Sequence, residues 1–186
     1  TKERVAREAL AEGVSIVNDV SGLTYSRGIA EAASEYGAGL VLMHTPSRPL
    51  DMQEKTRYVS LMDDIAGALG ISIDKALNAG VSGESIIVDP GFGFGKTAEQ
   101  NVIILRELAA LGGLGMPVMI GTSNKSFIGK IAGAGTEDRL LGTAATVAIG
   151  IMNGASLVRV HDVALMRSVV RMADAVAGKN YPGTER

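Results

Sequence analysis

Three short stretches gather side chains that can do chemistry: VDPGFGFGKT at 88–97, GTSNKSFIGK at 121–130 and SLVRVHDV at 156–163. The first ends in Gly-Lys-Thr, as a phosphate-binding P-loop does, but Pro90 stands where that loop needs its first glycine. Proline has no N–H to offer a phosphate. The glycines also alternate, which does not match the dinucleotide spacing. The candidate ligand group of this stretch is therefore Asp89, which follows the apolar run SIIV.

Asp89 has two interpretations. Aspartate before Pro-Gly is a common turn former. A partly buried carboxylate can instead accept two parallel N–H bonds from a planar ligand, such as the amino-pyrimidinone edge of a pterin or a guanine. Gly91 and Gly93 would let the backbone approach that ligand. Phe92 and Phe94 offer ring faces to a flat molecule, and we expect one of the two to belong to the core.

The second stretch reads as a strand end that turns into a helix. Lys125 can bond a ring carbonyl or a phosphate as a compact cation, or it is simply a solvated residue where the helix starts. Ser126 and the first N–H groups of that helix could receive an anion.

The third stretch places Arg159 and His161 two residues apart at a strand end, so both side chains point to one face. Together they suit a polyanion such as pyrophosphate. The alternative is an ion pair with Asp162 or Asp19.

Two earlier strand ends carry further polar groups. The amide of Asn18 suits the edge of a heterocycle, whereas Asp19 could cap a backbone turn. Met43 could give a heterocycle pocket a soft apolar wall. We interpret its neighbour His44 as a satisfied strand-end histidine.

These residues must be positioned by alternating strands and helices. Hydrophobic periodicity predicts strands at 14–18, 39–43, 85–89, 117–121 and 156–160. It predicts helices at 2–12, 26–36, 54–79, 98–111, 137–153 and 162–177. Gly70 could split the 54–79 segment into two helices. The alternation predicts an α/β fold with a parallel sheet, either doubly wound or a (β/α)8 barrel, with ligands at the carboxyl ends of the strands.

A single domain over residues 1–186 is expected, because no linker or low-complexity run divides the chain. Five strands are too few for a closed barrel, which takes about 250 residues. If the fold is a TIM barrel, the sequence covers roughly its last five βα units.

Composition narrows the function classes. A net charge of −2 without basic clusters argues against nucleic acid. The absence of cysteine excludes thiolate metal sites and fits a cytoplasmic protein. Two histidines make a multi-histidine metal site an unfavoured interpretation. The most apolar stretch, GTAATVAIGIMNGASLV, is interrupted by Asn153 and several glycines, so no membrane span is expected.

Taken together, the ordered segments NDVSG, LMH, VDPGFGFGKT, GTSNKSFIG, DRLLGTAAT and RVHDV closely resemble the dihydropteroate synthase family, over essentially the whole chain. That resemblance implies a parallel (β/α)8 TIM barrel and a cytoplasmic transferase of folate biosynthesis, the sulfonamide target. The implied reaction joins 6-hydroxymethyl-7,8-dihydropterin diphosphate to p-aminobenzoate and releases pyrophosphate, assisted by Mg²⁺. The family also implies a homodimer formed through the late helices.

The resemblance assigns roles residue by residue. The implied pterin contacts are Asn18, Met43, Asp89, Gly121 and Lys125. The implied p-aminobenzoate contacts are Phe94, Lys125 and Ser126, and the implied pyrophosphate clamp is Arg159 with His161. Among these, Asp89, Lys125 and Arg159 would be catalytic. The implied mechanism is dissociative: pyrophosphate leaves first, Asp89 stabilises the cationic pterin methylene, and the arylamine then attacks.

The sequence departs from the family in two ways. Asn124 stands where the family has an arginine between serine and lysine. The family's amino-terminal third, with its Mg²⁺-binding asparagine, is not in this sequence. We therefore expect no metal ligand among residues 1–186 and no turnover by these 186 residues alone. Two alternatives stay open: a pterin-barrel methyltransferase that acts on methyltetrahydrofolate with a corrinoid partner, and a non-catalytic pterin-binding module.

Overall fold

The computed structural model describes residues 1–46, 56–133 and 135–179, without the side chains of 136–138. The strands of this part are β1 (Ile16–Asp19), β2 (Gly39–Met43), β3 (Ile86–Asp89), β4 (Val118–Ile120) and β5 (Ala155–Val158). The α-helices are α1 (Glu3–Ala11), α2 (Gly28–Glu35), α3 (Leu61–Asn78), α4 (Ala98–Arg106), α5 (Ser126–Ala132), α6 (Thr136–Met152) and α7 (Val163–Val176). Short 3₁₀ turns are η1 (Gly83–Ser85) and η2 (Leu108–Leu114).

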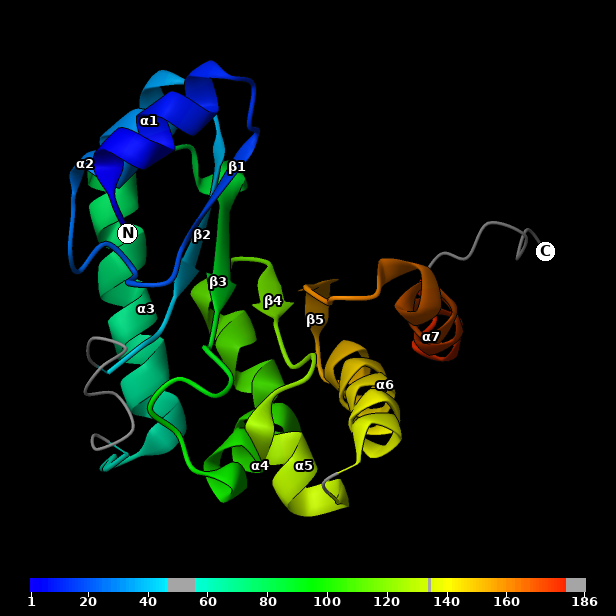
Figure 1. Ribbon diagram of the computed structural model, residues 1–186. Helices are drawn as coiled ribbons and strands as arrows, with labels where there is room; N and C mark the ends of the chain where they lie inside the picture. The colour runs from blue at the N-terminus through cyan, green and yellow to red at the C-terminus, as the bar shows by residue number, and fades with distance from the viewer. Residues whose placement is uncertain (47–55, 134, 180–186) are drawn as a thin grey trace.

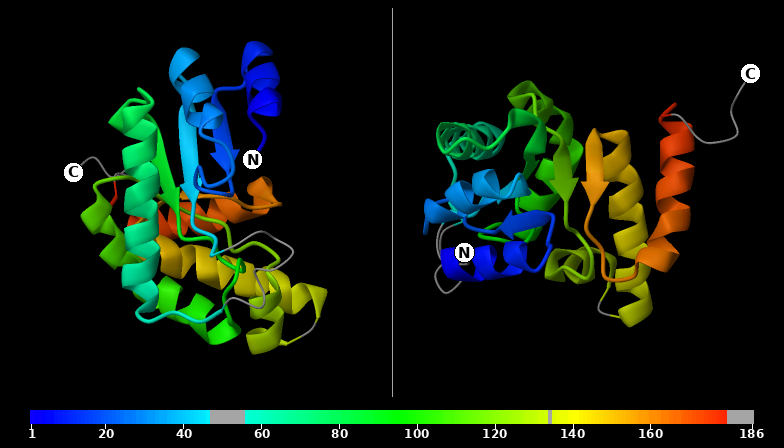
Figure 2. Two further views of the ribbon diagram at one scale, coloured as in Figure 1. Left: turned by 90° about the vertical axis from the view of Figure 1, so that its left-hand side faces the viewer. Right: turned by 90° about the horizontal axis from the view of Figure 1, so that it is seen from above.

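The strands form one parallel sheet in which spatial order follows chain order, β1-β2-β3-β4-β5 (Figure 1). A doubly wound sheet reverses its strand order at a switch point, and no reversal occurs here among the described strands. Viewed from above, the helices lie around the outside of an arc of strands (Figure 2). Of the two predicted architectures, the structure therefore has that of a (β/α)8 barrel, of which the described residues form five strands.

Alternation along the strands separates the outer face from the inner face. Outward side chains join the core between the sheet and the helices, and this layer includes Leu40, Leu42, Ile86, Val88, Val118 and Ile120. The outer face of the sheet thus packs against the helices. The side chains of the inner face take no part in that packing and can contact a ligand.

The inner face carries the predicted site. Because register partners in a parallel sheet point the same way, Asn18 lies on the side of its partner Val41, and Met43 on the side of its partner Asp89. Ile120 pairs with Val158 on the outer side, so the residues that follow them, Gly121 and Arg159, turn inward. Five separate chain segments thereby deliver candidate residues to one concave surface.

The helix boundaries correct two predictions. The 54–79 segment is one helix only over Leu61–Asn78, and residues 54–55 lie outside the described part. Gly70 does not divide it, because Ile65, Leu69 and Ile73 on either side are buried, and this packing outweighs the roughly 1 kcal/mol cost of a helical glycine. None of the described helices combines the length and apolarity needed to cross a bilayer.

The predicted helix 98–111 is an α-helix only to Arg106 and continues as the 3₁₀ turn η2. The amide of Asn153 donates to the carbonyl of Leu105 at 2.8 Å, which satisfies one of the free carbonyls where the helix ends. Thr97 begins α4 with a capping box shared with Gln100, which fixes the start of this helix.

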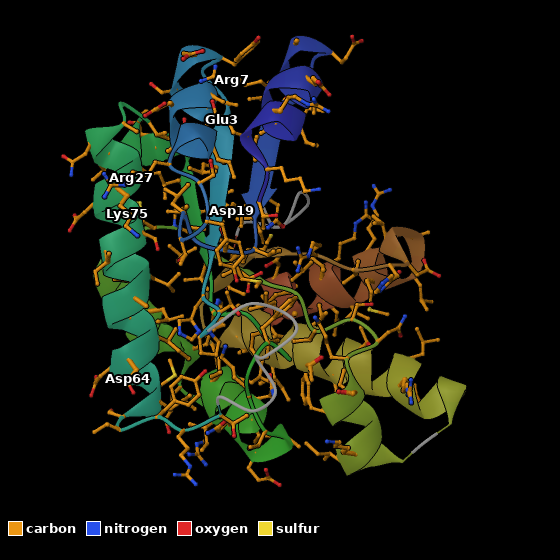
Figure 3. All side chains as sticks on the ribbon, turned by 60° about the vertical axis from the view of Figure 1, so that its left-hand side comes forward. Glu3, Arg7, Asp19, Arg27, Asp64 and Lys75 are labelled. Carbon is orange, nitrogen blue, oxygen red and sulfur yellow. The ribbon has the colours of Figure 1, made fainter. Side chains whose placement is uncertain are left out.

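Asp19, at the end of β1 (Figure 3), is structural. Its carboxylate accepts from the backbone N–H of Ser21 at 3.1 Å and of Leu23 at 2.7 Å, and it is fully buried. It therefore fixes the turn after β1, which includes Leu23 in the left-handed region at φ 59°. Arg7 of α1 forms ion pairs with Glu3 of the same helix (Figure 3) and with Glu35 of α2. The second ion pair links α1 to α2.

Candidate functional site

Asp89 ends β3 with its side chain 1% exposed. Its Oδ1 accepts from the Gly91 N–H at 2.7 Å. Its Oδ2 has no hydrogen-bond partner among the described residues, and the nearest cation, Arg159 Nη2, is 3.7 Å away. Burial raises the pKa of Asp89, whereas the Gly91 N–H and the charges of Arg159, Lys96 and Lys125 oppose that shift. The site thus holds a buried carboxylate with one oxygen available to a ligand.

Asn18 and Asp89 are linked by one arginine. Arg159 Nη1 donates to Asn18 Oδ1, and its Nη2 faces Asp89. Asn18 Nδ2 is buried and has no hydrogen-bond partner within the described residues. A donor and an acceptor without partners therefore lie on the same inner face, on either side of a guanidinium. Arg159 pairs with neither Asp162 nor Asp19, because Asp162 caps α7 through Leu165 N–H at 2.8 Å and Asp19 holds its own turn.

Lys125 lies at the mouth of the site, in the turn between β4 and α5. Its Nζ is 4.3 Å from the centroid of the Phe94 ring, a cation–π contact. Desolvation lowers the pKa of Lys125, and the charge of Arg159 acts in the same direction. The charge of Asp89 opposes this shift. A partly buried ammonium at this position can act as a hydrogen-bond donor to a ligand. Phe94 is partly exposed beside it.

His161 is held by the turn after β4. Ser123 Oγ lies 2.9 Å from His161 Nδ1 and also accepts from the His161 N–H at 3.3 Å. Gly121, Ser123, Lys125, Arg159, Val160 and His161 line one cavity of about 370 Å³. The structure therefore brings the two predicted anion-binding residues, Arg159 and His161, to one opening together with Lys125.

Two glycines lie at close approaches of the site. A Cβ on Gly121 would come within 2.8 Å of Arg159 Nη2, so a side chain there would shift the guanidinium from the position it has at the end of β4. Gly91 has φ +74°, and a Cβ there would come within 2.0 Å of the His44 carbonyl oxygen. The Asp89-Pro-Gly turn therefore needs both the left-handed conformation and the missing side chain of glycine.

The remaining candidate residues differ in their exposure. Met43 neighbours Asp89 in register on the inner face and is 1% exposed, so its side chain is a buried part of that face. Ser126 begins α5 and is exposed, and α5 has only seven residues. Phe92 is core, 1% exposed and stacked on Phe127 at 6.2 Å between ring centroids. The expectation that one phenylalanine belongs to the core is confirmed.

The sequence reasoning gave Lys96 no role at the site. Its ammonium is buried and donates to the carbonyls of Gly91 at 3.0 Å and Phe94 at 2.9 Å. It also lies 3.1 Å from Nδ1 of His44, which is buried as expected for a satisfied histidine. The sequence signal was weak: a lysine that directly follows a run of alternating glycines.

The described residues contain no group of three or more His, Cys, Asp or Glu side chains placed to hold a metal ion. The acidic groups of the site are limited to Asp89, whose surroundings are cationic. This part of the chain therefore does not fit a Mg²⁺ site by itself, and no chemical step is derived through the metal.

Comparison with known proteins agrees with this geometry. A family model described as "Pterin binding enzyme" matches residues 1–161. A dihydropteroate synthase of Synechocystis is 44% identical over 177 residues, covering 95% of this chain and 61% of the relative. The crystal structure of dihydropteroate synthase from Thermus thermophilus in complex with 4-aminobenzoate has a TM-score of 0.86 at 37% identity, covering 94% of this chain and 71% of that one.

A further relative is the "Inactive dihydropteroate synthase 2" of Mycobacterium bovis, 33% identical over 186 aligned positions, which cover 97% of this chain and 58% of that protein. The chain spans about three-fifths of the length of the curated relatives it matches. The matched segment includes every strand end that carries a candidate residue. The chain therefore belongs to the pterin-binding enzyme family, whose dihydropteroate synthases share its partial barrel.

Proposed function

We propose that this chain is the substrate-binding part of a dihydropteroate synthase, which condenses 6-hydroxymethyl-7,8-dihydropterin diphosphate with p-aminobenzoate to give 7,8-dihydropteroate and pyrophosphate. The observation that carries the proposal is the pair of buried, unpartnered atoms Asn18 Nδ2 and Asp89 Oδ2 on one face of the sheet. An amino-pyrimidinone edge presents two adjacent N–H donors beside a ring-nitrogen acceptor. The carboxylate matches the donors and the amide matches the acceptor.

The roles of the remaining residues follow from their positions. Arg159 and His161 would bind the diphosphate at the 370 Å³ cavity that they line. Phe94 and Lys125 would form the wall against which p-aminobenzoate binds, with Ser126 at its outer edge and Gly121 and Met43 shaping the pterin pocket. Lys125 would also contact the pterin, because it lines the same cavity as Arg159, which faces Asp89.

The reaction breaks the methylene C–O bond, and its electron pair leaves with pyrophosphate. Arg159 and His161 stabilise the departing negative charge, and the Asp89 carboxylate stabilises positive charge on the pterin. The arylamine nitrogen then gives its lone pair to the methylene carbon and loses a proton. No side-chain nucleophile is needed in this scheme.

Several finer statements belong to the proposal. The ligands of the implied Mg²⁺ would lie in the amino-terminal third of the family, which this sequence does not include. The protein would be cytoplasmic, and a single domain would include residues 1–186. It would form a homodimer through α6 and α7, where Leu141, Met172 and Val176 are 69%, 68% and 64% exposed. The 186 residues alone would not turn over, because β1 and β5 each have one unpaired edge within the described sheet.

The test is pyrophosphate release by the intact protein, given both substrates. We expect turnover that depends on p-aminobenzoate and a strong loss in Asp89→Asn and Arg159→Ala. A protein that binds the pterin but never releases pyrophosphate would instead be a non-catalytic pterin-binding module, the alternative that the inactive relative keeps in view. Turnover only with methyltetrahydrofolate and a corrinoid protein would support the methyltransferase.

A further inference from the structure

Lys96 is the buried charged group that the mechanism above does not use. Its side chain is 4% exposed, yet its Nζ meets three neutral acceptors rather than a carboxylate: the carbonyls of Gly91 and Phe94 and Nδ1 of His44. An ammonium has three protons, so all three donors are used. Burial lowers the pKa of Lys96 to about 7, although the charge of Asp89 raises it. The three hydrogen bonds offset part of the cost of burying the ammonium.

The loop that Lys96 contacts is rich in glycine. Gly91, Gly93 and Gly95 all have positive φ, at 74°, 77° and 60°. Such glycines lose more conformational freedom on ordering than other residues. The Gly91 carbonyl accepts from both Lys96 Nζ and the Phe94 N–H, the latter at 3.1 Å. Lys96 therefore forms hydrogen bonds with the loop at its first glycine, Gly91, and near its end, at Phe94.

Gly91 and Phe94 each contact a residue of the candidate site. The Gly91 N–H donates to Asp89 Oδ1 and so fixes which carboxylate oxygen stays free. The Phe94 ring stands against Lys125. We propose, on the basis of the proposed function, that Lys96 is a positioning residue for both substrates, because its ammonium sets the loop that orients Asp89 and Phe94.

The charge of Lys96 adds a second effect. Asp89 is faced by Arg159 from the end of β5, by Lys125 from the turn after β4 and by Lys96 from its own loop, and each of these charges lowers the pKa of Asp89 against the effect of burial. Lys96 is faced in turn by His44 from the end of β2, with Tyr58 beside it at 6.0 Å between ring centroids. Removing the ammonium should shift the protonation of Asp89 to higher pH.

Two substitutions separate the hydrogen bonds of Lys96 to the loop from its positive charge. Lys96→Met removes both, whereas Lys96→Gln keeps a donor for a loop carbonyl and removes the charge. Lys130→Met makes the same chemical change on the exposed side of α5 and serves as the matched control. The experiment is calorimetric titration of the intact protein with 6-hydroxymethyl-7,8-dihydropterin over a range of pH, with the fold monitored by circular dichroism.

We expect Lys96→Met to lose about tenfold or more in pterin affinity, the loss typical of a broken hydrogen-bond network with a charged member. Lys96→Gln should keep most of the pterin affinity at alkaline pH. As the pH falls, its affinity should begin to drop at a higher pH than that of the wild type, and this falling part of the profile is the acid limb. Lys130→Met should match the wild type. A purely structural lysine would not move that acid limb.

The proposal is overturned if both Lys96 variants fold and bind pterin with the affinity and pH dependence of the wild type. It is also overturned if neither folds, because Lys96 would then serve the fold rather than the site. If Lys96→Met alone fails to fold, the acid limb of Lys96→Gln decides. Absence of pterin binding by the wild type would contradict the proposed function itself, which is a distinguishable result.

Discussion

Arg159 donates to Asn18 and faces Asp89, the two side chains that we propose bind the edge of the pterin. Arg159→Ala should lower kcat/KM of the intact enzyme about 10- to 100-fold, the range for lost hydrogen bonds to charged groups. Arg159→Lys should recover only part, because a lysine cannot bridge two partners in one plane. Steady-state kinetics check this, and an unchanged kcat/KM in the alanine variant would exclude the role.

His44 predicts how stability responds to acid. Desolvation and the charge of Lys96 lower its pKa from 6.5 to about 3. Between these values the unfolded chain binds the proton and the folded chain does not, so stability is lost as pH falls through that window, by at most about 1.4 kcal/mol per pH unit. Urea unfolding at several pH values should show this slope, and His44→Gln should flatten it. An equal slope in the variant would contradict the assignment.

The sequence predicted those site residues that lie at or just after the ends of strands. Asn18, Asp89, Lys125, Arg159 and His161 each follow a short apolar run, and parallel strands bring such ends together. The inner position of Ser123 beside His161 and the burial of Lys96 beside His44 depend on contacts across 38 and 52 residues of sequence. Local patterns do not encode such pairings.

At the scale of elements, the turn between β4 and α5 depends on backbone conformation. Asn124 has φ +59°, in the left-handed region. Asparagine adopts it more readily than most residues, whereas a β-branched side chain is strained there. Asn124→Val should therefore destabilise the intact protein by about 1–2 kcal/mol and move His161, while Asn124→Gly should not. Thermal unfolding of the two variants tests this, and equal stability would refute it.

Asn124 is also where the sequence departs from the family pattern, and the structure gives the departure a physical context. The Asn124 N–H donates to Thr143 Oγ1 at 3.3 Å, and its side-chain amide lies 3.5 Å from His161 Nδ1. The residue thus touches the side of the cavity proposed for pyrophosphate. The effect of the missing arginine on p-aminobenzoate binding stays a prediction.

Helix ends were the elements hardest to predict. The apolar periodicity of 98–111 continues through η2, so the pattern alone does not show that α4 ends at Arg106. The cause is the Asn153 amide, which approaches from the end of α6, 48 residues later in the chain. The strands, in contrast, matched closely, because short β-branched runs bounded by turn residues leave little choice.

At the scale of the whole molecule, α6 and α7 present an apolar surface. Met152, Val169, Met172 and Val176 line a groove of about 500 Å³. Met172→Glu would place a charge in the proposed dimer contact and should weaken association about tenfold or more. Analytical ultracentrifugation of the intact protein checks this. Val59→Glu, at a fully exposed position outside the groove, is the control. Identical sedimentation of all three proteins would contradict the proposed contact at Met172.

Local sequence patterns alone predicted the architecture of the whole molecule only to two alternatives, and the resemblance to dihydropteroate synthases implied the barrel. Alternating strands and helices fit both a doubly wound sheet and a barrel, because the difference lies in strand order, which no local pattern records. The parallel order β1-β2-β3-β4-β5 decided it. The consequence for function is large: a barrel arc turns the inward residues of successive strands toward one point.

The central claim is that Asp89 Oδ2 and Asn18 Nδ2 form the edge that binds a pterin. The most direct measurement is isothermal titration of the intact protein with 6-hydroxymethyl-7,8-dihydropterin diphosphate, comparing wild type with Asp89→Asn. The amide fills the same space but offers a donor to the donors of the ligand. The account predicts about 100-fold weaker binding, as expected when a charged, buried hydrogen-bond acceptor is replaced. Equal affinity in the two proteins would contradict it.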